Sequence, residues 1–368
     1  MVYRRNRDRP ARSVNARWLS ASGAVCLLVA TGARELPAQE KLQIVATLPA
    51  YGSIAAEIAG DRAEVTSIAR GDEDAHFVRP RPSFAAALAR ADLFVSTGLD
   101  LELWVPALLD RANNGKVVTG APGSVAAYSG VTLLEVPASV SRSEGDVHVF
   151  GNPHIYTDPI NAILIARNIL AGLVRIDPDN AELYTENTER FAERIIRSTF
   201  GDPLTDMLGA DVLFALARKD EFWEFAAGQT FQDKPLTDYV GGWMELAAPF
   251  RGRRIACYHR NWAYFTNRFD VECAVYIEPK VGIPPSPGHV NDVTELMQRE
   301  QIPALLAANY FSRSQVERVA DRTDATAVVV PFNVGGVQGV DDYFDLIDYW
   351  VTHLAVAFEG APGDRSHP

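Results

Sequence analysis

The sequence predicts an α/β protein with two βα lobes, mainly parallel sheets and a cleft between the lobes. Short apolar runs of strand type alternate with stretches of helix type, and this alternation is typical of βαβ units that build a parallel sheet. Two such series flank one long segment with a polar face, from about residue 181 to residue 199, which is predicted to be a backbone helix joining the lobes. A chain of 368 residues with 47% apolar and 22% charged residues can hold about two domains with substantial cores.

Five parts are therefore expected. Residues 1–38 form a signal peptide, 39–176 the first lobe, 177–200 the linking helix, 201–360 the second lobe and 361–368 a tail. In the leader, six arginines within the first 17 residues precede an apolar run, and Ala38 offers a small residue for cleavage. This layout predicts a periplasmic or otherwise extracytoplasmic protein, with a retained N-terminal anchor as the alternative. Cys26 lacks the small residue usually found before a lipidated cysteine, so lipidation is not expected.

The charge balance argues against one class of partner. Residues 1–38 hold seven of the 35 basic and two of the 47 acidic side chains, so the rest of the chain carries a formal net charge of −17. Such a charge keeps a protein soluble and attracts cations, whereas binding to phosphate backbones needs the opposite sign. We expect no nucleic-acid partner.

The first series of elements is expected to contain four strands. Strands 42–48, 63–68, 93–97 and 116–119 alternate with helices 53–58, 84–91 and 101–111, and a further helix covers 159–174. Ser83 and Asp158 are candidate N-caps of the helices that follow them. Residues 139–151 show no apolar periodicity and are predicted to be a surface loop.

The second series repeats this alternation. Strands 254–258, 272–277, 304–308 and 327–330 are expected with helices 262–268, 289–300, 314–322 and 343–358. Residues 201–250 are mixed, and Trp223, Phe225, Trp243 and Met244 are expected in the core. Cys257 and Cys273 lie on consecutive strands; an oxidising compartment permits a disulfide, and two buried thiols are equally compatible with the sequence.

Three histidines, His76, His154 and His259, lie after a strand or before a helix, in two different lobes. Ligands of parallel sheets bind beyond the carboxyl ends of the strands, so the three imidazoles are predicted to share one site. Three imidazoles with one oxygen suit tetrahedral Zn²⁺, whereas Mn²⁺ prefers more oxygens. Asp74 and Asp158 are candidate acceptors that orient the imidazoles.

The remaining histidines carry weaker hypotheses. His148 is interpreted as a solvated residue, with a transient metal ligand as the alternative. His289, at a helix start, and His353 and His367, on the surface, are expected to have no function.

With these residues in place, the chain resembles the periplasmic solute-binding proteins of zinc and manganese ABC transporters, over nearly all of residues 41–358. The matching segments are Asp74-Ala-His76 with Arg81-Pro-Ser83, residues 88–98 with Leu101-Glu-Leu-Trp104, residues 151–159, and Tyr258-His259 before Tyr264-Phe265. The resemblance implies a monomer that holds zinc, or alternatively manganese, in the cleft between two lobes joined by a long helix. It also implies delivery of the metal to a membrane permease and no enzymatic activity.

The chain departs from this family in its fourth ligand. The family usually has an aspartate directly after the last strand of the second lobe, and none stands there. Water, Asn333, Asp341, Asp342 and Glu278 remain open as alternatives. The family's histidine-rich loop is reduced here to Glu144-Gly-Asp-Val-His148.

Two other classes of protein compete with this interpretation, a secreted zinc-dependent hydrolase and an adhesion protein. Catalytic zinc sites often take two ligands from one short segment, whereas these histidines are 78 and 105 residues apart, as capture by domain closure requires. An adhesion protein has no need of three converging imidazoles.

Overall fold

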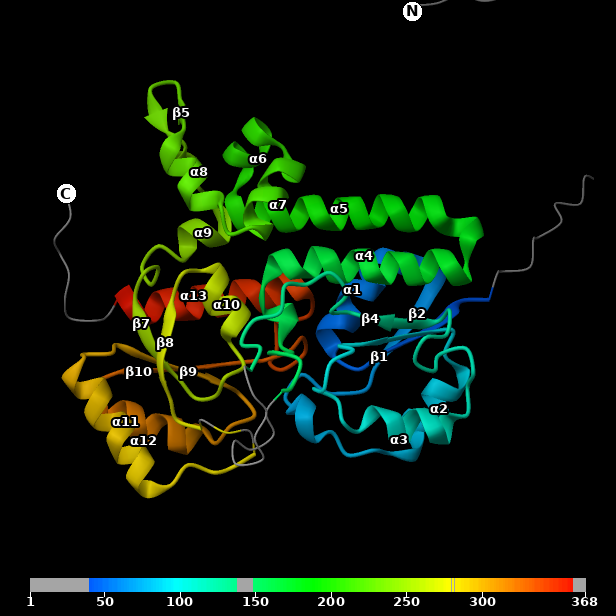
Figure 1. Ribbon diagram of the computed structural model, residues 1–368, viewed down its shortest axis with the longest axis horizontal. Coiled ribbons are helices and arrows are strands. Elements are labelled where there is room, and N and C mark those ends of the chain that lie inside the picture. Colours follow the sequence, from blue (N-terminus) through cyan, green and yellow to red (C-terminus); the bar gives the residue numbers. More distant parts are fainter. Residues whose placement is uncertain (1–39, 138–147, 279, 281, 360–368) are drawn as a thin grey trace, which may run out of the picture. The chain divides into compact units, whose positions relative to one another are not determined.

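The first four strands pair in parallel, in the order β2-β1-β3-β4 (Figure 1). Their bounds are β1 Leu42–Ala46, β2 Ala63–Ser67, β3 Leu93–Ser96 and β4 Ser124–Ala126. β1 pairs with both β2 and β3, and the second half of this central strand is buried. The sheet therefore has the parallel topology that the alternation of strands and helices predicts.

The computed structural model describes residues 40–137, 148–278, 280 and 282–359. The expected signal peptide with Cys26, the tail with His367 and residues 139–147 of the expected loop lie outside the described residues.

Helices cover both faces of the first sheet. α1 (Pro49–Ala59) and α4 (Pro159–Ile176) pack on one face, and α2 (Pro82–Arg90) and α3 (Val105–Ala112) lie on the other (Figure 1). Proline at the first helical position has its φ already set and lacks the N–H that would have no partner there. α2 therefore begins at Pro82 with Arg81 as its N-cap, and the prediction that Ser83 caps this helix is wrong. Asp158 does cap α4, accepting a hydrogen bond from the Ile160 amide (2.8 Å).

The predicted strand at residues 116–119 is also wrong, because this segment forms turns after α3. Asn113 ends α3 in the left-handed conformation, and the Gly123 amide then bonds back to the Lys116 carbonyl (3.0 Å). Val117 is buried as an anchor of the turn. The chain therefore reaches the edge of β3 only at Ser124, where β4 begins.

A second parallel sheet has the order β10-β9-β7-β8. Its strands are β7 Arg254–Cys257, β8 Glu272–Tyr276, β9 Ala304–Ala308 and β10 Thr326–Val330. α10 (Ala263–Arg268) and α13 (Tyr343–Glu359) pack on one face, and α11 (Pro287–Arg299) and α12 (Arg313–Thr323) on the other (Figure 1). Every strand and helix predicted for this sheet is present, with ends shifted by two residues at most.

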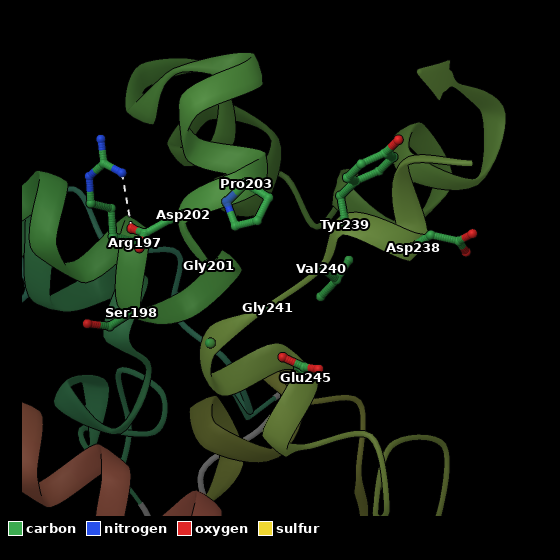
Figure 2. Close-up of a pocket in the computed structure, with 11 residues that line it drawn as sticks. Arg197, Ser198, Gly201, Asp202, Pro203, Asp238, Tyr239, Val240, Gly241 and Glu245 are labelled. Atoms are coloured by element: carbon green, nitrogen blue, oxygen red, sulfur yellow. Dashed lines mark hydrogen bonds and ion pairs between the residues drawn. The ribbon is translucent and has the colours of Figure 1, made fainter. Parts of the chain in front are cut away.

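Residues 201–250, which the sequence left unassigned, form short helices and a hairpin. They are α6 (Asp202–Leu208), α7 (Ala210–Arg218), α8 (Phe222–Gly228), β5 (Thr230–Phe231), β6 (Lys234–Pro235), the 3-10 turn Leu236–Tyr239 and α9 (Gly242–Leu246). Of the four side chains expected in the core, Trp243 and Met244 are buried, and Trp223 and Phe225 pack against the core while partly exposed. A pocket of about 620 Å³ lies between α6, α9 and the C-terminal end of helix α5 (Ala181–Phe200). The ion pair between Arg197 and Asp202 lies on the wall of this pocket (Figure 2).

The long helix α5 (Ala181–Phe200) packs along α4 and contacts both α1 and α9. Arg194 of α5 pairs with Glu57 of α1 (2.7 Å) and with Asp342 before α13 (3.6 Å). It therefore touches elements beside both sheets, in agreement with the predicted backbone helix. The boundaries of the two lobes stay a prediction, since residues from Lys41 onward form one compact unit.

Among the described residues, α4 is the one helix that is long and apolar enough to cross a membrane. Burial of 61% of it inside the protein accounts for this composition.

A disulfide joins Cys257 of β7 to Cys273 of β8, with their Cα atoms 5.5 Å apart. Of the two alternatives that the sequence left open, the structure has the disulfide. It ties together the two strands whose ends lead to His259 and Glu278.

Replacing both cysteines with alanine is expected to lower the free energy of unfolding by about 3 kcal/mol. The bond closes a loop with a sequence separation of 16 residues, and closing a loop of this size removes about that much chain entropy from the unfolded state. Urea unfolding of wild type and the double variant, both without metal, measures the difference. Equal transition midpoints would contradict the expectation.

Candidate metal site

Four imidazoles lie together in this structure. Ring centroids are 5.2 Å apart for His76 and His148, 5.3 Å for His76 and His154, 6.3 Å for His76 and His259, and 6.0 Å for His148 and His154. The three histidines expected from the sequence are thus brought together from segments that are 78 and 105 residues apart.

His76 is held by a 3-10 turn, Ala75–Phe77, that Asp74 caps. Asp74 Oδ1 accepts hydrogen bonds from the His76 amide (3.0 Å) and from His76 Nδ1 (2.7 Å), so the expected acceptor is in place. Trp104 anchors the turn by donating its indole N–H to the Ala75 carbonyl (2.8 Å). Burial alone would raise the pKa of Asp74, but the hydrogen bonds from His76 lower this pKa overall.

His154 lies just before the N-terminus of α4 and is 1% exposed. Its Nδ1 bonds to Asn152 Oδ1 (2.9 Å), and its ring packs edge-on against Phe332. Its Nε2 is buried and has no hydrogen-bond partner among the described residues. A buried nitrogen without a partner costs free energy unless a ligand satisfies it.

His259 follows β7, and its Nδ1 bonds to the backbone carbonyl of Glu278, which follows the neighbouring strand β8 (3.2 Å). The parallel pairing of β7 and β8 places both residues at the carboxyl edge of the sheet. This is the position at which parallel sheets present ligand-binding groups.

His148 is not a solvated residue, so the preferred interpretation from the sequence is wrong. Its side chain is 14% exposed, its Nδ1 bonds to Asp100 Oδ1 (3.1 Å), and the Val149 amide bonds to Asp100 Oδ2 (2.9 Å). Its Nε2 faces His76 Nε2 at 3.1 Å. Its position six residues before His154 was the feature of the sequence that could have indicated a place in the same cluster. Nothing in the sequence indicated Asp100 as its partner.

All four histidines use Nδ1 to bond an oxygen atom, which leaves Nε2 for another partner. An ionised carboxylate only accepts hydrogen bonds, so Asp74 and Asp100 require the proton on Nδ1 of His76 and His148. The Nε2 lone pairs of these two rings then face each other and need a cation or a proton between them. For comparison, Zn–N bonds of about 2.05 Å at the tetrahedral angle separate two nitrogens by about 3.3 Å.

The rings do not yet form a closed coordination shell. Within the described ranges, no group of three or more His, Cys, Asp and Glu side chains has the donor arrangement of a metal site. The hydrogen bonds at Nδ1 fix how each ring is oriented, with its Nε2 directed away from the acceptor.

Burial keeps two of the imidazoles neutral. It lowers the pKa of His259 to about 4, with the nearby His76 adding to the effect. It also lowers the pKa of His154 well below its usual value, and here all three other histidines contribute. A neutral imidazole is the form that binds metal.

The metal-free protein is expected to lose stability as the pH falls from about 6.5 toward 4. In this range an unfolded histidine binds a proton and folded His259 does not, so the unfolded state binds more protons and the free energy of unfolding falls with the pH. His154 acts in the same direction. Urea unfolding at pH 7.5, 6 and 5 tests this, and His259→Gln should flatten the dependence. A stability that is constant over this range would contradict the expectation.

Three of the other candidates for the fourth ligand, Asn333, Asp342 and Glu278, use a side-chain oxygen in another hydrogen bond. Asn333 Oδ1 accepts from the Ala50 amide (2.7 Å), and Asp342 pairs with Arg194 and caps the first turn of α13. For Asp341, the bond is made by its backbone amide, which donates to Asp345 Oδ2 (2.9 Å). Glu278 lies near the imidazoles, but its Oε1 accepts from the Gly282 amide (2.9 Å). Burial raises the pKa of Glu278.

Asp158 bonds to no imidazole in the structure; besides capping α4, it pairs with Arg268, so the idea that it orients a histidine is not supported. His289 lies in the first turn of α11, the expected position, and its Nε2 bonds to the Tyr276 carbonyl (2.9 Å). His353 lies on the exposed face of α13, also as expected.

Two parallel sheets and a cluster of four imidazoles define an α/β protein with a candidate metal site. A family model described as "Zinc-uptake complex component A periplasmic" matches residues 44–198 and 233–357. The chain therefore belongs to this family of solute-binding proteins of metal ABC transporters.

Its relatives are named for different metals. The chain is 25% identical to the iron-binding protein YfeA of Yersinia pestis over 322 residues, which cover 87% of each chain. It is 32% identical over 154 residues to the manganese-binding lipoprotein MntA of Halalkalibacterium halodurans, covering 42% of this chain and 46% of that protein. It is 30% identical over 178 residues to the zinc-binding lipoprotein AdcA of Streptococcus pneumoniae, covering 48% and 35%.

Solved structures share the fold. A zinc-bound ZnuA deletion mutant has a TM-score of 0.63 at 21% identity, over 88% of this chain and 100% of that one. A manganese-bound S38A mutant of a periplasmic metal-binding protein from Candidatus Liberibacter asiaticus has a TM-score of 0.61 at 19% identity, over 87% and 100%.

Proposed function

We propose that this chain is an extracytoplasmic solute-binding protein that captures a divalent transition metal, most favourably zinc, and delivers it to an ABC permease. The observation that carries the proposal is the orientation of the four imidazoles. Nδ1 of each ring is bonded to oxygen, and the buried Nε2 of His154 has no partner in the part of the chain that the structure describes. Metal-bound histidines generally have such an acceptor on the second nitrogen.

Zinc is favoured over manganese because the available donors are nitrogens. Imidazole suits zinc, whereas manganese prefers carboxylates and water. The carboxylates nearest the rings, Asp74 and Asp100, are used as acceptors from Nδ1. The relatives are named for iron, manganese and zinc, and therefore do not favour one metal. The choice of zinc rests on the donor set of this chain.

Binding is favoured over hydrolysis by the fourth imidazole. A catalytic zinc site has three protein ligands and keeps one position for water. Here His148 Nε2 lies 3.1 Å from His76 Nε2, so as a ligand His148 would fill the position that a hydrolase leaves open. We propose His76, His148, His154 and His259 as the ligands.

Competition among metals tests the choice of ion. The metal-free protein, residues 39–368, is mixed with equal concentrations of Zn²⁺, Mn²⁺ and Fe²⁺ under anaerobic conditions, and bound metal is measured by native mass spectrometry. We expect one zinc ion per chain. Retention of manganese or iron in preference to zinc would overturn the choice of zinc, and binding of none of them would overturn the function.

The fourth ligand is tested by comparing His148→Ala with Glu278→Gln. We expect His148→Ala to lower zinc affinity about tenfold or more, because one nitrogen donor is lost. Glu278→Gln keeps the shape of the side chain and should bind as wild type does, as should Asp341→Ala and Asp342→Ala. A larger loss in Glu278→Gln than in His148→Ala, measured against a competing chelator, would make the glutamate the ligand.

A further inference from the structure

The side chain of Asn152 links the two chain segments that carry His154 and His259. Its Oδ1 accepts hydrogen bonds from the His154 amide (3.1 Å) and from His154 Nδ1 (2.9 Å). Its Nδ2 donates to the carbonyl of Arg260, the residue after His259 (2.7 Å), and to Glu135 Oε2 (2.8 Å). Asn152 itself is 4% exposed.

The backbone of Asn152 is also held by hydrogen bonds, to Leu134 and to Tyr264. Its amide donates to the Leu134 carbonyl (2.8 Å), and its carbonyl accepts from the hydroxyl of Tyr264 on α10 (2.7 Å). The Tyr264 oxygen also accepts from the Leu134 amide (3.2 Å). Backbone and side chain of Asn152 therefore both connect the His154 segment to the chain around His259.

The orientation of the Asn152 amide group follows from its partners. A rotation by 180° would place the Nδ2 donor against the His154 amide, which is also a donor. It would place Oδ1 against the carbonyl of Arg260 and the carboxylate of Glu135, which are acceptors. Only the orientation with Oδ1 toward His154 and Nδ2 toward Arg260 and Glu135 satisfies all four contacts.

We propose that Asn152 is a positioning residue that aligns His154 and His259 for the same metal ion. The inference rests on the proposed metal-binding function. An aspartate at this position could still accept from His154, but it would set a negative oxygen against the Arg260 carbonyl and Glu135. An alanine would remove the contacts on both sides.

Zinc affinity tests the alignment, with Asn168→Asp as a matched control. Asn168 on α4 also donates through Nδ2 to two carbonyls, those of Ala127 (3.0 Å) and Ser129 (2.9 Å), and contacts none of the four histidines in the structure. We expect Asn152→Asp and Asn152→Ala to bind zinc about 10- to 100-fold more weakly than wild type, as is typical for loss of a group that orients a ligand. Asn168→Asp should bind as wild type does. Wild-type affinity in both Asn152 variants would overturn the proposal.

Two readouts on the metal-free protein separate this proposal from the proposed function. Nitrogen-15 NMR of the imidazoles should show His154 protonated at Nδ1 in wild type and in Asn152→Asp, and a mixture of tautomers in Asn152→Ala. Backbone amide exchange over residues 258–266 should be faster in both Asn152 variants and unchanged in Asn168→Asp. A wild-type protein that binds no metal would overturn the proposed function. The two measurements on the metal-free protein would still test the role of Asn152. If neither the His154 tautomer nor the amide exchange changes in the two Asn152 variants, the proposal that Asn152 positions the histidines is overturned.

Discussion

His154→Ala is expected to lower zinc affinity at least about 100-fold, which corresponds to about 2.7 kcal/mol of binding free energy. The change removes a proposed ligand whose Nε2 is buried and has no hydrogen-bond partner within the described residues. Water cannot readily take the place of the lost imidazole, because His154 is 1% exposed and packs edge-on against Phe332. Chelator competition measures the affinity, and His76→Ala and His259→Ala should show losses of similar size.

Two controls accompany this prediction. His353→Ala removes an exposed imidazole stacked on Tyr349 of the same helix and should leave affinity unchanged. His154→Gln keeps most of the buried volume, so a loss of affinity there reflects the lost nitrogen rather than a cavity. If His154→Ala and wild type bind zinc equally well, the assignment of the site is wrong.

Arg268→Met is expected to lower the free energy of unfolding by about 3–5 kcal/mol, the usual cost of leaving a buried charge without its partner. Arg268 Nε and Nη2 donate to the two oxygens of Asp158, both at 2.9 Å. The two side chains are 7% and 6% exposed, so water cannot replace the guanidinium. Burial of Arg268 lowers its pKa, but the charge and hydrogen bonds of Asp158 raise this pKa overall, so the group stays charged.

Urea unfolding of the metal-free proteins measures this effect. Arg197→Met is the matched control, because its ion pairs with Glu193, Asp202 and Asp206 are exposed and such pairs contribute about 1 kcal/mol or less. The double variant Asp158→Asn with Arg268→Met should recover part of the loss, because the buried carboxylate that pairs with Arg268 is then absent as well, while Asp220, the other partner of Arg268, is exposed. An Arg268→Met protein as stable as Arg197→Met would contradict the prediction.

Local patterns in the sequence predicted most of the fold. The second sheet shows this best, because each buried strand is a short apolar run and each helix has one apolar face, so the strand β9 was predicted at its observed bounds, Ala304–Ala308. The predictions failed where a short apolar run had another cause than a strand. The apolar pair at 117–118 resembled a strand, but Val117 fills the core from a turn.

The candidate site was predicted in part. His76, His154 and His259 could be found because each follows a strand or precedes a helix, and such positions in parallel sheets lie at the ligand-binding edge. His148 could not be found in this way, since it lies in a stretch without periodicity and its partner Asp100 is 48 residues away. The same holds for Arg268 and Asp158, which are 110 residues apart.

The α/β class, the order of the elements and three of the four clustered histidines could be predicted from local patterns, because these depend on periodicity and on the position of a residue within its own element. The partners of these residues became known from the folded chain: the disulfide between Cys257 and Cys273, the acceptor at each imidazole and the amide of Asn152 between two segments. A hydrogen bond or an ion pair depends on distances of about 3 Å between atoms. Such distances between remote segments are set by the packing of both sheets and of the helices that connect them.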